Sequence, residues 1–106
     1  MGMTVVVTRN APERFRGFLA SVMLEIAPGV YTAPRMSKGV RQRVWDTCTE
    51  WASLLGSDAA IVMTWQEPAQ AGGQGILTLG VPAKALTEHD GVWLCRREVP
   101  TPDTPF

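Results

Sequence analysis

The sequence predicts an α+β fold, with two helices packed on a mainly antiparallel sheet. Two stretches have apolar residues at helical spacing, and short runs rich in β-branched residues surround them. The chain has 106 residues, 45% of them hydrophobic, which suits one globular domain. No apolar run approaches the roughly 20 residues that cross a bilayer, and the first residues do not resemble a signal peptide. We therefore expect one cytoplasmic domain over residues 1–99, without membrane contact, and a disordered Pro-rich tail over residues 100–106.

The first expected elements are a strand over residues 3–8 and a helix over residues 12–26. The strand is almost entirely apolar, which predicts burial on both of its faces. Asn10 is placed to cap the helix, and Pro12 stands where a missing N–H costs nothing. The apolar stripe of this helix consists of Phe15, Leu19, Val22, Met23 and Ile26.

A short strand over residues 30–33 and a second helix over residues 38–55 come next. Ser37 is placed to cap this helix. Its apolar stripe consists of Val40, Val44, Cys48, Trp51 and Leu55. The position of Cys48 on this stripe predicts a buried, reduced thiol.

Three further strands are expected, over residues 59–65, 75–80 and 92–99, the last one after a polar loop. The first two form a hairpin with a long connection. The order of helices and strands is that of a ferredoxin-like sandwich with an extra C-terminal strand. Only one clear strand lies between the helices, where that fold has two. Either the fold is a variant or one predicted boundary is misplaced.

Charge is divided unevenly along the chain, although the net charge is zero. Residues 1–45 hold seven basic and two acidic residues, and residues 46–106 hold three basic and eight acidic residues, which gives +5 and −5. Such asymmetry indicates one face for a polyanion and another for a different partner, unless the segregation is chance on a solvated surface. Arg9, Arg14 and Arg16 surround a helix N-terminus, whose free amides favour an anion. This end of the helix is therefore predicted to bind phosphate.

The run from Val5 to Gly17, VVVTRNAPERFRG, resembles the CRISPR-associated protein 2 family, in its type I-E form. Further matches in the same order are Leu24-Glu25, Gly29-Val30-Tyr31, Val44-Trp45, Val62-Met63-x-Trp65, Thr78-x-Gly80 and Asp90-Gly91-Val92. No single piece is diagnostic, but the ordered set is specific and extends from residue 1 to about residue 99.

The resemblance implies a homodimer of ferredoxin-like subunits that lies between two dimers of the CRISPR integrase, the CRISPR-associated protein 1 family. In such an assembly the small dimer supports the double-stranded prespacer DNA, and the integrase performs strand transfer. The function expected from the resemblance is thus a non-catalytic scaffold in spacer acquisition, which needs no cofactor.

A metal-dependent endonuclease acting on RNA or DNA is the alternative function, because many members of the wider family are described so. Their proposed Mg²⁺ ligand is an acid at the end of the first strand, where this chain has Arg9, and a guanidinium repels a divalent ion. Glu13 is the nearest acid and suits an interaction with the helix N-terminus, while Glu67 and Asp90 lie in predicted loops. We therefore expect no catalytic residue and no metal ligand. A ligand-sensing or oligomerisation module is the third possibility, from the fold alone.

Seven basic residues are expected to bind nucleic acid. Arg14 and Arg16 match the family's paired basic residues at the start of the first helix, and the resemblance implies that they contact phosphates without reading bases. The whole set is Arg9, Arg14, Arg16, Lys38, Arg41, Arg43 and Lys84. The alternative is an ordinary solvated surface, with the stem of Arg41 lying along the edge of the core. Four phosphate contacts per subunit give about eight per dimer, and a salt slope of log K of roughly −7.

The last strand is expected to dock on the integrase by pairing with a strand of that partner. The residues expected at this contact are Val92, Trp93, Leu94 and Val99. The alternative is a strand that pairs within the chain or crosses the homodimer.

Overall fold

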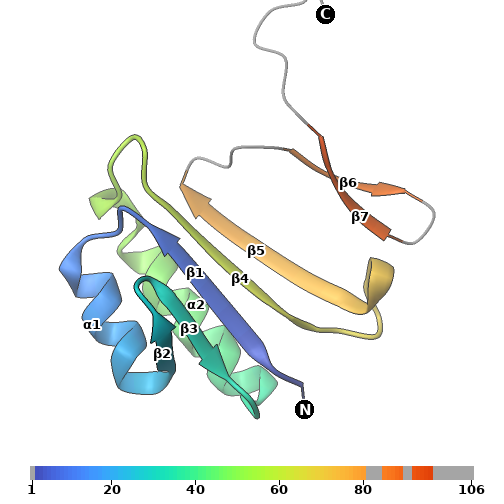
Figure 1. Ribbon diagram of the computed structural model, residues 1–106, viewed down its shortest axis with the longest axis horizontal. Coiled ribbons are helices and arrows are strands. Elements are labelled where there is room, and N and C mark those ends of the chain that lie inside the picture. Colours follow the sequence, from blue (N-terminus) through green and yellow to red (C-terminus); the bar gives the residue numbers. More distant parts are fainter. Residues whose placement is uncertain (1, 81–84, 90–91, 97–106) are drawn as a thin grey trace, which may run out of the picture.

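The computed structural model describes residues 2–80, 85–89 and 92–96, with side chains described over residues 2–80 (Figure 1). Its strands are β1 (Thr4–Arg9), β2 (Leu24–Ala27), β3 (Val30–Ala33), β4 (Ala60–Gln66), β5 (Gln74–Gly80), β6 (Ala85–His89) and β7 (Val92–Arg96). Its helices are α1 (Glu13–Val22) and α2 (Lys38–Glu50), with short 3-10 helices η1 (Ala52–Leu54) and η2 (Ala71–Gly73). No helix in the described part of the chain is long and apolar enough to cross a membrane.

The main sheet has the strand order β2-β3-β1-β4-β5, and all neighbouring strands in it are antiparallel (Figure 1). The order β4-β1-β3-β2, with one helix after β1 and the other after β3, is the ferredoxin-like arrangement predicted from the sequence. Strand β5 extends this sheet beyond β4, and β6 and β7 form a separate antiparallel hairpin.

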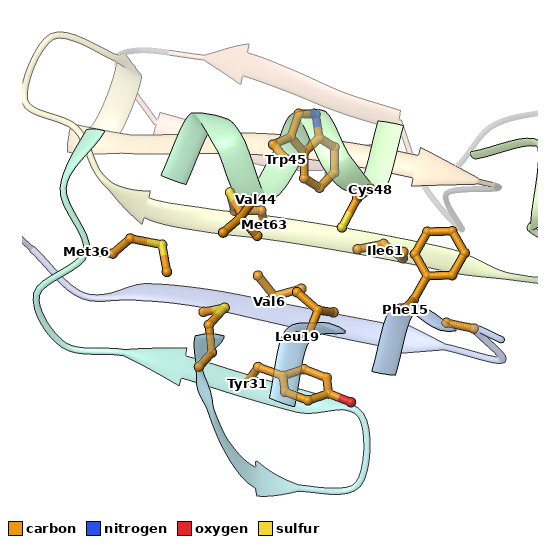
Figure 2. Packing of buried hydrophobic residues seen from close by; sticks show 12 residues of the cluster. Val6, Phe15, Leu19, Tyr31, Met36, Val44, Trp45, Cys48, Ile61 and Met63 are labelled. Atoms are coloured by element: carbon orange, nitrogen blue, oxygen red, sulfur yellow. The ribbon is translucent and has the colours of Figure 1, made fainter. Parts of the chain in front are cut away.

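The hydrophobic core lies between the two helices and one face of the main sheet (Figure 2). Val6 of β1 is the cross-strand partner of both Tyr31 in β3 and Met63 in β4, so these three buried side chains share a face. The helices cover them with Phe15, Leu19, Val44, Trp45 and Cys48. Trp45 lies outside the stripe that helical spacing predicted, yet it is buried.

The opposite face of the main sheet carries apolar side chains that neither α1 nor α2 covers. Val7 is 43% exposed and has Val30 and Val62 as its cross-strand partners. The expectation that the first strand is buried on both faces is therefore wrong for this single chain. Both helices pack on the face that contains Val6, which leaves Val7 and Arg9 exposed and Val5 half-buried on the other face of β1.

The first helix is shorter than predicted, and its expected last turn is strand β2. Helix α1 ends at Val22, and β2 pairs with β3 through a turn at Gly29, whose φ is +77°. The Glu25 side chain accepts a 3.1 Å hydrogen bond from the Gly29 amide, which stabilises this turn. Val22 and Ile26 are 42% and 59% exposed, so their helical spacing does not reflect burial. β2 is also the second strand between the helices, so the boundary predicted for the end of the first helix was misplaced, which was one of the two alternatives.

Four further predictions about local structure can be compared with the fold. The Ser37 Oγ accepts a 3.2 Å hydrogen bond from the Val40 amide, which confirms the predicted cap of α2. Asn10 does not cap α1, because Pro12 is the N-cap residue and Asn10 has a φ of +52°. Helix α2 ends at Glu50 and continues as η1, five residues earlier than predicted. Strand β6 replaces part of the expected polar loop, and the tail lies outside the described residues.

Cys48 is 1% exposed, as predicted, and burial raises the pKa of its thiol to about 11 from 9.0. The folded state favours the neutral thiol. The contribution of this group to stability is therefore fully present below about pH 9 and is lost as the pH rises through 11. When the pH is raised from about 8 to about 10.5, we expect ionisation of this thiol to lower the free energy of unfolding by about 2 kcal/mol. Urea unfolding at the two pH values measures the change.

Replacement Cys48→Ala removes this part of the alkaline destabilisation, although it also lowers stability at every pH by creating a cavity. Tyr31→Phe is the control, because burial and the nearby charge of Glu25 raise the pKa of the Tyr31 hydroxyl as well. An alkaline loss of equal size in Cys48→Ala and in the parent chain would contradict the prediction.

Candidate nucleic-acid interface

The turn between β1 and α1 brings three arginines to one end of the domain. Arg9 is the last residue of β1 and is exposed beside its strand partner Ala60. The left-handed backbone of Asn10 reverses the chain, and its side-chain amide donates a 3.1 Å hydrogen bond to the Asp58 carboxylate. This bond links the turn to the loop before β4.

The N-terminus of α1 carries its own positive potential. Pro12 gives no side-chain cap, and its carbonyl accepts from the amides of Phe15 and Arg16. Helical geometry leaves the amides of Glu13 and Arg14 without an acceptor inside the helix. These amides add to the positive end of the helix dipole, which favours an anion next to the first turn.

Arg16 is an exposed side chain with a weakly held acidic partner. Its guanidinium donates to the Glu13 carboxylate at 2.6 Å, and the two side chains are 50% and 83% exposed. Exposed ion pairs of this kind contribute little to stability, because water and salt screen them. The remaining N–H groups of Arg16 stay available to another anion.

Arg14 is held by an aromatic ring. Its Cζ atom lies 4.9 Å from the centre of the Trp51 ring, at the C-terminal end of α2. Phe15 and Phe18 make edge-to-face contacts with the same indole, at centroid distances of 5.8 and 5.6 Å. Arg14 is nevertheless exposed. Helix α1 thus places both Arg14 and Arg16 on the surface, while Phe15 and Leu19 of the same helix are buried.

Arg41 occupies a different environment, next to β4. Its side chain is 13% exposed, and its Cζ atom lies 4.4 Å from the centre of the Trp65 ring. The Glu67 carboxylate is 3.9 Å from this guanidinium and accepts a 3.3 Å hydrogen bond from the Trp65 indole N–H. Gly75 leaves the space for the indole, since a Cβ atom there would overlap the ring. The stem of Arg41 therefore lies along the edge of the core.

Lys38, the first residue of α2, lies away from the arginines at the start of α1. The start of α1 lies at the end of α2, because Arg14 contacts Trp51. Lys38 is at the other end of α2, about 20 Å away at 1.5 Å per residue. Lys38 and Arg43 are both exposed. Lys84 lies outside the described residues.

The expected integrase-binding strand is described only in its backbone. Residues Val92, Trp93 and Leu94 belong to β7 and have His89, Glu88 and Thr87 of β6 as cross-strand partners. One edge of β7 is therefore paired within the chain, and Val99 lies outside the described residues.

The acids that sequence reasoning considered as metal ligands lie apart. Glu13 pairs with Arg16, and Glu67 contacts Arg41 and Trp65. Asp90 lies outside the described residues. Within the residues whose side chains are described, no three His, Cys, Asp or Glu side chains come together. At the N-terminus of α1, the arginines and the free backbone amides offer positive charge and N–H donors to an anion.

Sequence reasoning missed the two tryptophans that contact Arg14 and Arg41. Trp51 was assigned to the apolar stripe of the second helix, and Trp65 to a strand. Neither contact follows from local spacing, because each joins a helix to a segment more than 20 residues away. Side chains alternate along β4, so Trp65 lies on the same face of the sheet as the buried Met63. This alternation is the one sequence signal that Trp65 faces the helices.

The architecture is that of a small ferredoxin-like α+β domain, with an arginine-rich helix N-terminus at one end. Residues 3–94 match the family model described as CRISPR-associated protein (Cas_Cas2CT1978). The chain therefore belongs to this Cas2-like family, and the membership supports a CRISPR-related role.

Proposed function

We propose that this protein is the dimeric, non-catalytic scaffold of a type I-E spacer-acquisition complex. It binds the phosphate backbone of a prespacer duplex and bridges two integrase dimers. The observation that carries the proposal is the exposed pair Arg14 and Arg16 on the first turn of α1, in a member of a CRISPR-associated family. The ordered set of residues that resembles type I-E proteins supports the subtype.

Arg14, Arg16 and Arg9 are the main phosphate contacts in this proposal. Guanidinium groups make strong, charge-assisted hydrogen bonds to phosphate, and such contacts position a duplex without reading its sequence. Along α2, Lys38 is about 20 Å from Trp51, which contacts Arg14 at the N-terminus of α1. This distance corresponds to about six base pairs along a duplex. Lys38 therefore suits a second contact on the same duplex. Arg41 contributes little, because its side chain is mostly covered.

A second copy of the chain covers the open face of the main sheet in the proposed homodimer. This face presents apolar side chains from four adjacent strands, namely Val5, Val7, Val30, Val62 and Ile76. In a two-fold dimer the same patch meets its own copy, so one apolar face is sufficient for both partners. The helices then point outward on both subunits, and Arg14 and Arg16 remain exposed. The β6–β7 hairpin is left for the integrase.

Size exclusion with light scattering tests the assembly. We expect a dimer of the chain alone, and two copies of it with four integrase subunits when integrase and a forked duplex are added. Val7→Glu is expected to give a monomer, because it places a charge in the buried centre of the proposed interface. Val22→Glu is the matched control, since Val22 is equally exposed but lies on α1.

A monomeric parent chain, or a dimer that withstands Val7→Glu, would rule out the sheet-to-sheet dimer. Failure of the parent dimer to associate with integrase would rule out the bridging role. Mg²⁺-dependent cleavage of DNA or RNA by the purified chain, lost on replacement of one carboxylate, would favour the endonuclease alternative instead.

A further inference from the structure

The two arginines at the start of α1 are held in different ways. The two ion pairs among the described side chains involve Arg16 and Arg41, whereas Arg14 lies on the indole of Trp51. An acidic partner neutralises a guanidinium and occupies its N–H donors. An aromatic face does neither, because it attracts the flat side of the cation and leaves the donors in the guanidinium plane.

The indole that holds Arg14 is itself fixed by both helices. The edge-to-face contacts with Phe15 and Phe18, at interplanar angles of 86° and 79°, place the ring against α1. The backbone N–H of Trp51 donates to the carbonyls of Thr47 and Cys48 at 3.2 Å, which anchors the residue at the end of α2. The ring is half-buried, so its position follows from the packing of the core.

A fixed ring reduces the number of conformations that Arg14 adopts before binding. A free surface arginine loses much rotamer freedom when it contacts a phosphate, and this loss weakens binding. An arginine already held against a ring loses less. Arg14 also belongs to the first turn of α1, where the free amides favour the same anion.

We infer that Trp51 is a positioning residue for phosphate: it holds Arg14 in the orientation that binds the backbone of a nucleic acid. The inference rests on the proposed function, since it assigns a role within the same binding surface. Trp51 acts here through Arg14, without a contact of its own to the nucleic acid.

A double-mutant cycle tests the inference with the full-length chain and a labelled duplex of random sequence. Trp51→Leu is expected to weaken duplex binding about two- to five-fold, the range of a cation–π contact near the surface. In the Arg14→Ala background, Trp51→Leu is expected to have no further effect. In the Arg16→Ala background, it is expected to have its full effect, because Arg16 pairs with Glu13.

Two further measurements separate positioning from a general loss of structure. Trp51→Phe keeps an aromatic face and is expected to retain part of the affinity that Trp51→Leu loses. If Trp51→Leu does not fold, Trp51→Phe replaces it in the double-mutant cycle. In proton NMR spectra of the free protein, the Arg14 side-chain δ protons are expected to be shifted upfield by the indole ring current. This shift is expected to disappear in Trp51→Leu.

The possible failures are distinguishable. If the parent chain shows the ring-current shift but does not bind duplex, the proposed function fails while the Arg14–Trp51 contact stands. If the parent chain binds duplex and Trp51→Leu weakens binding equally with and without Arg14, the inference is overturned, because the indole then acts independently of this arginine. An absent ring-current shift overturns it as well.

Discussion

Replacement of Arg14 and Arg16 together by alanine is expected to lower the affinity for duplex DNA by on the order of 10²–10³-fold at about 0.1 M salt. The double change removes four of about eight phosphate contacts in the proposed dimer, and each contact contributes about 0.9 to the salt slope. The slope of log K against log salt is therefore expected to change from roughly −7 to roughly −4. Fluorescence anisotropy over a range of salt concentrations measures both quantities.

Two controls identify the cause of the lost affinity. Arg35→Ala removes an exposed arginine that lies outside the proposed contacts, and it is expected to leave the slope unchanged. Replacement of both arginines by lysine keeps the charge, so we expect the slope to persist while affinity falls, because lysine lacks the planar fork of arginine. Unchanged binding by the double alanine variant would show that the duplex binds elsewhere.

Leu19→Ala is expected to lower the free energy of unfolding by about 2–5 kcal/mol, whereas Val22→Ala on the same helix is expected to change it by less than about 1 kcal/mol. Leu19 is 0% exposed between α1 and the sheet, so its truncation leaves a cavity (Figure 2). Val22 is 42% exposed and leaves little empty space. Urea unfolding of both variants at equal protein concentration measures the difference.

This pair also tests the boundary between α1 and β2. If α1 continued beyond Val22 as the sequence predicts, Val22 would lie on the buried stripe, and both truncations would be costly. Losses of similar size would therefore contradict the observed end of the helix. Equal protein concentrations matter, because formation of the proposed dimer would couple stability to concentration.

The sequence was sufficient for the elements whose periodicity and end signals agree. Strand β3 has the predicted residues, and Ser37 caps α2, because both are determined by local chemistry. Strand β2 was missed because Met23 and Ile26 continue the helical spacing of α1 by coincidence. What decides its structure is pairing with β3 across the Gly29 turn, and helical periodicity contains no information about that pairing.

The candidate site was predictable to a similar extent. The exposure of Arg14 and Arg16 follows from their places on a helical wheel, and the structure agrees. The partners of the arginines depend on how the two helices lie against each other. The contact between Arg14 and Trp51 therefore required the fold, and so did the covering of Arg41 by Trp65.

The central position of β1 has a consequence for how the chain folds during synthesis. Thr4 of β1 pairs with Trp65 of β4 across 61 residues of sequence. Strand β1 is therefore synthesised long before β4, its partner in the sheet. At about 5–20 residues per second on the ribosome, this delay is about 3–12 s. During that time the apolar run of β1 has at most β3 beside it, so the incomplete sheet exposes apolar surface that favours aggregation.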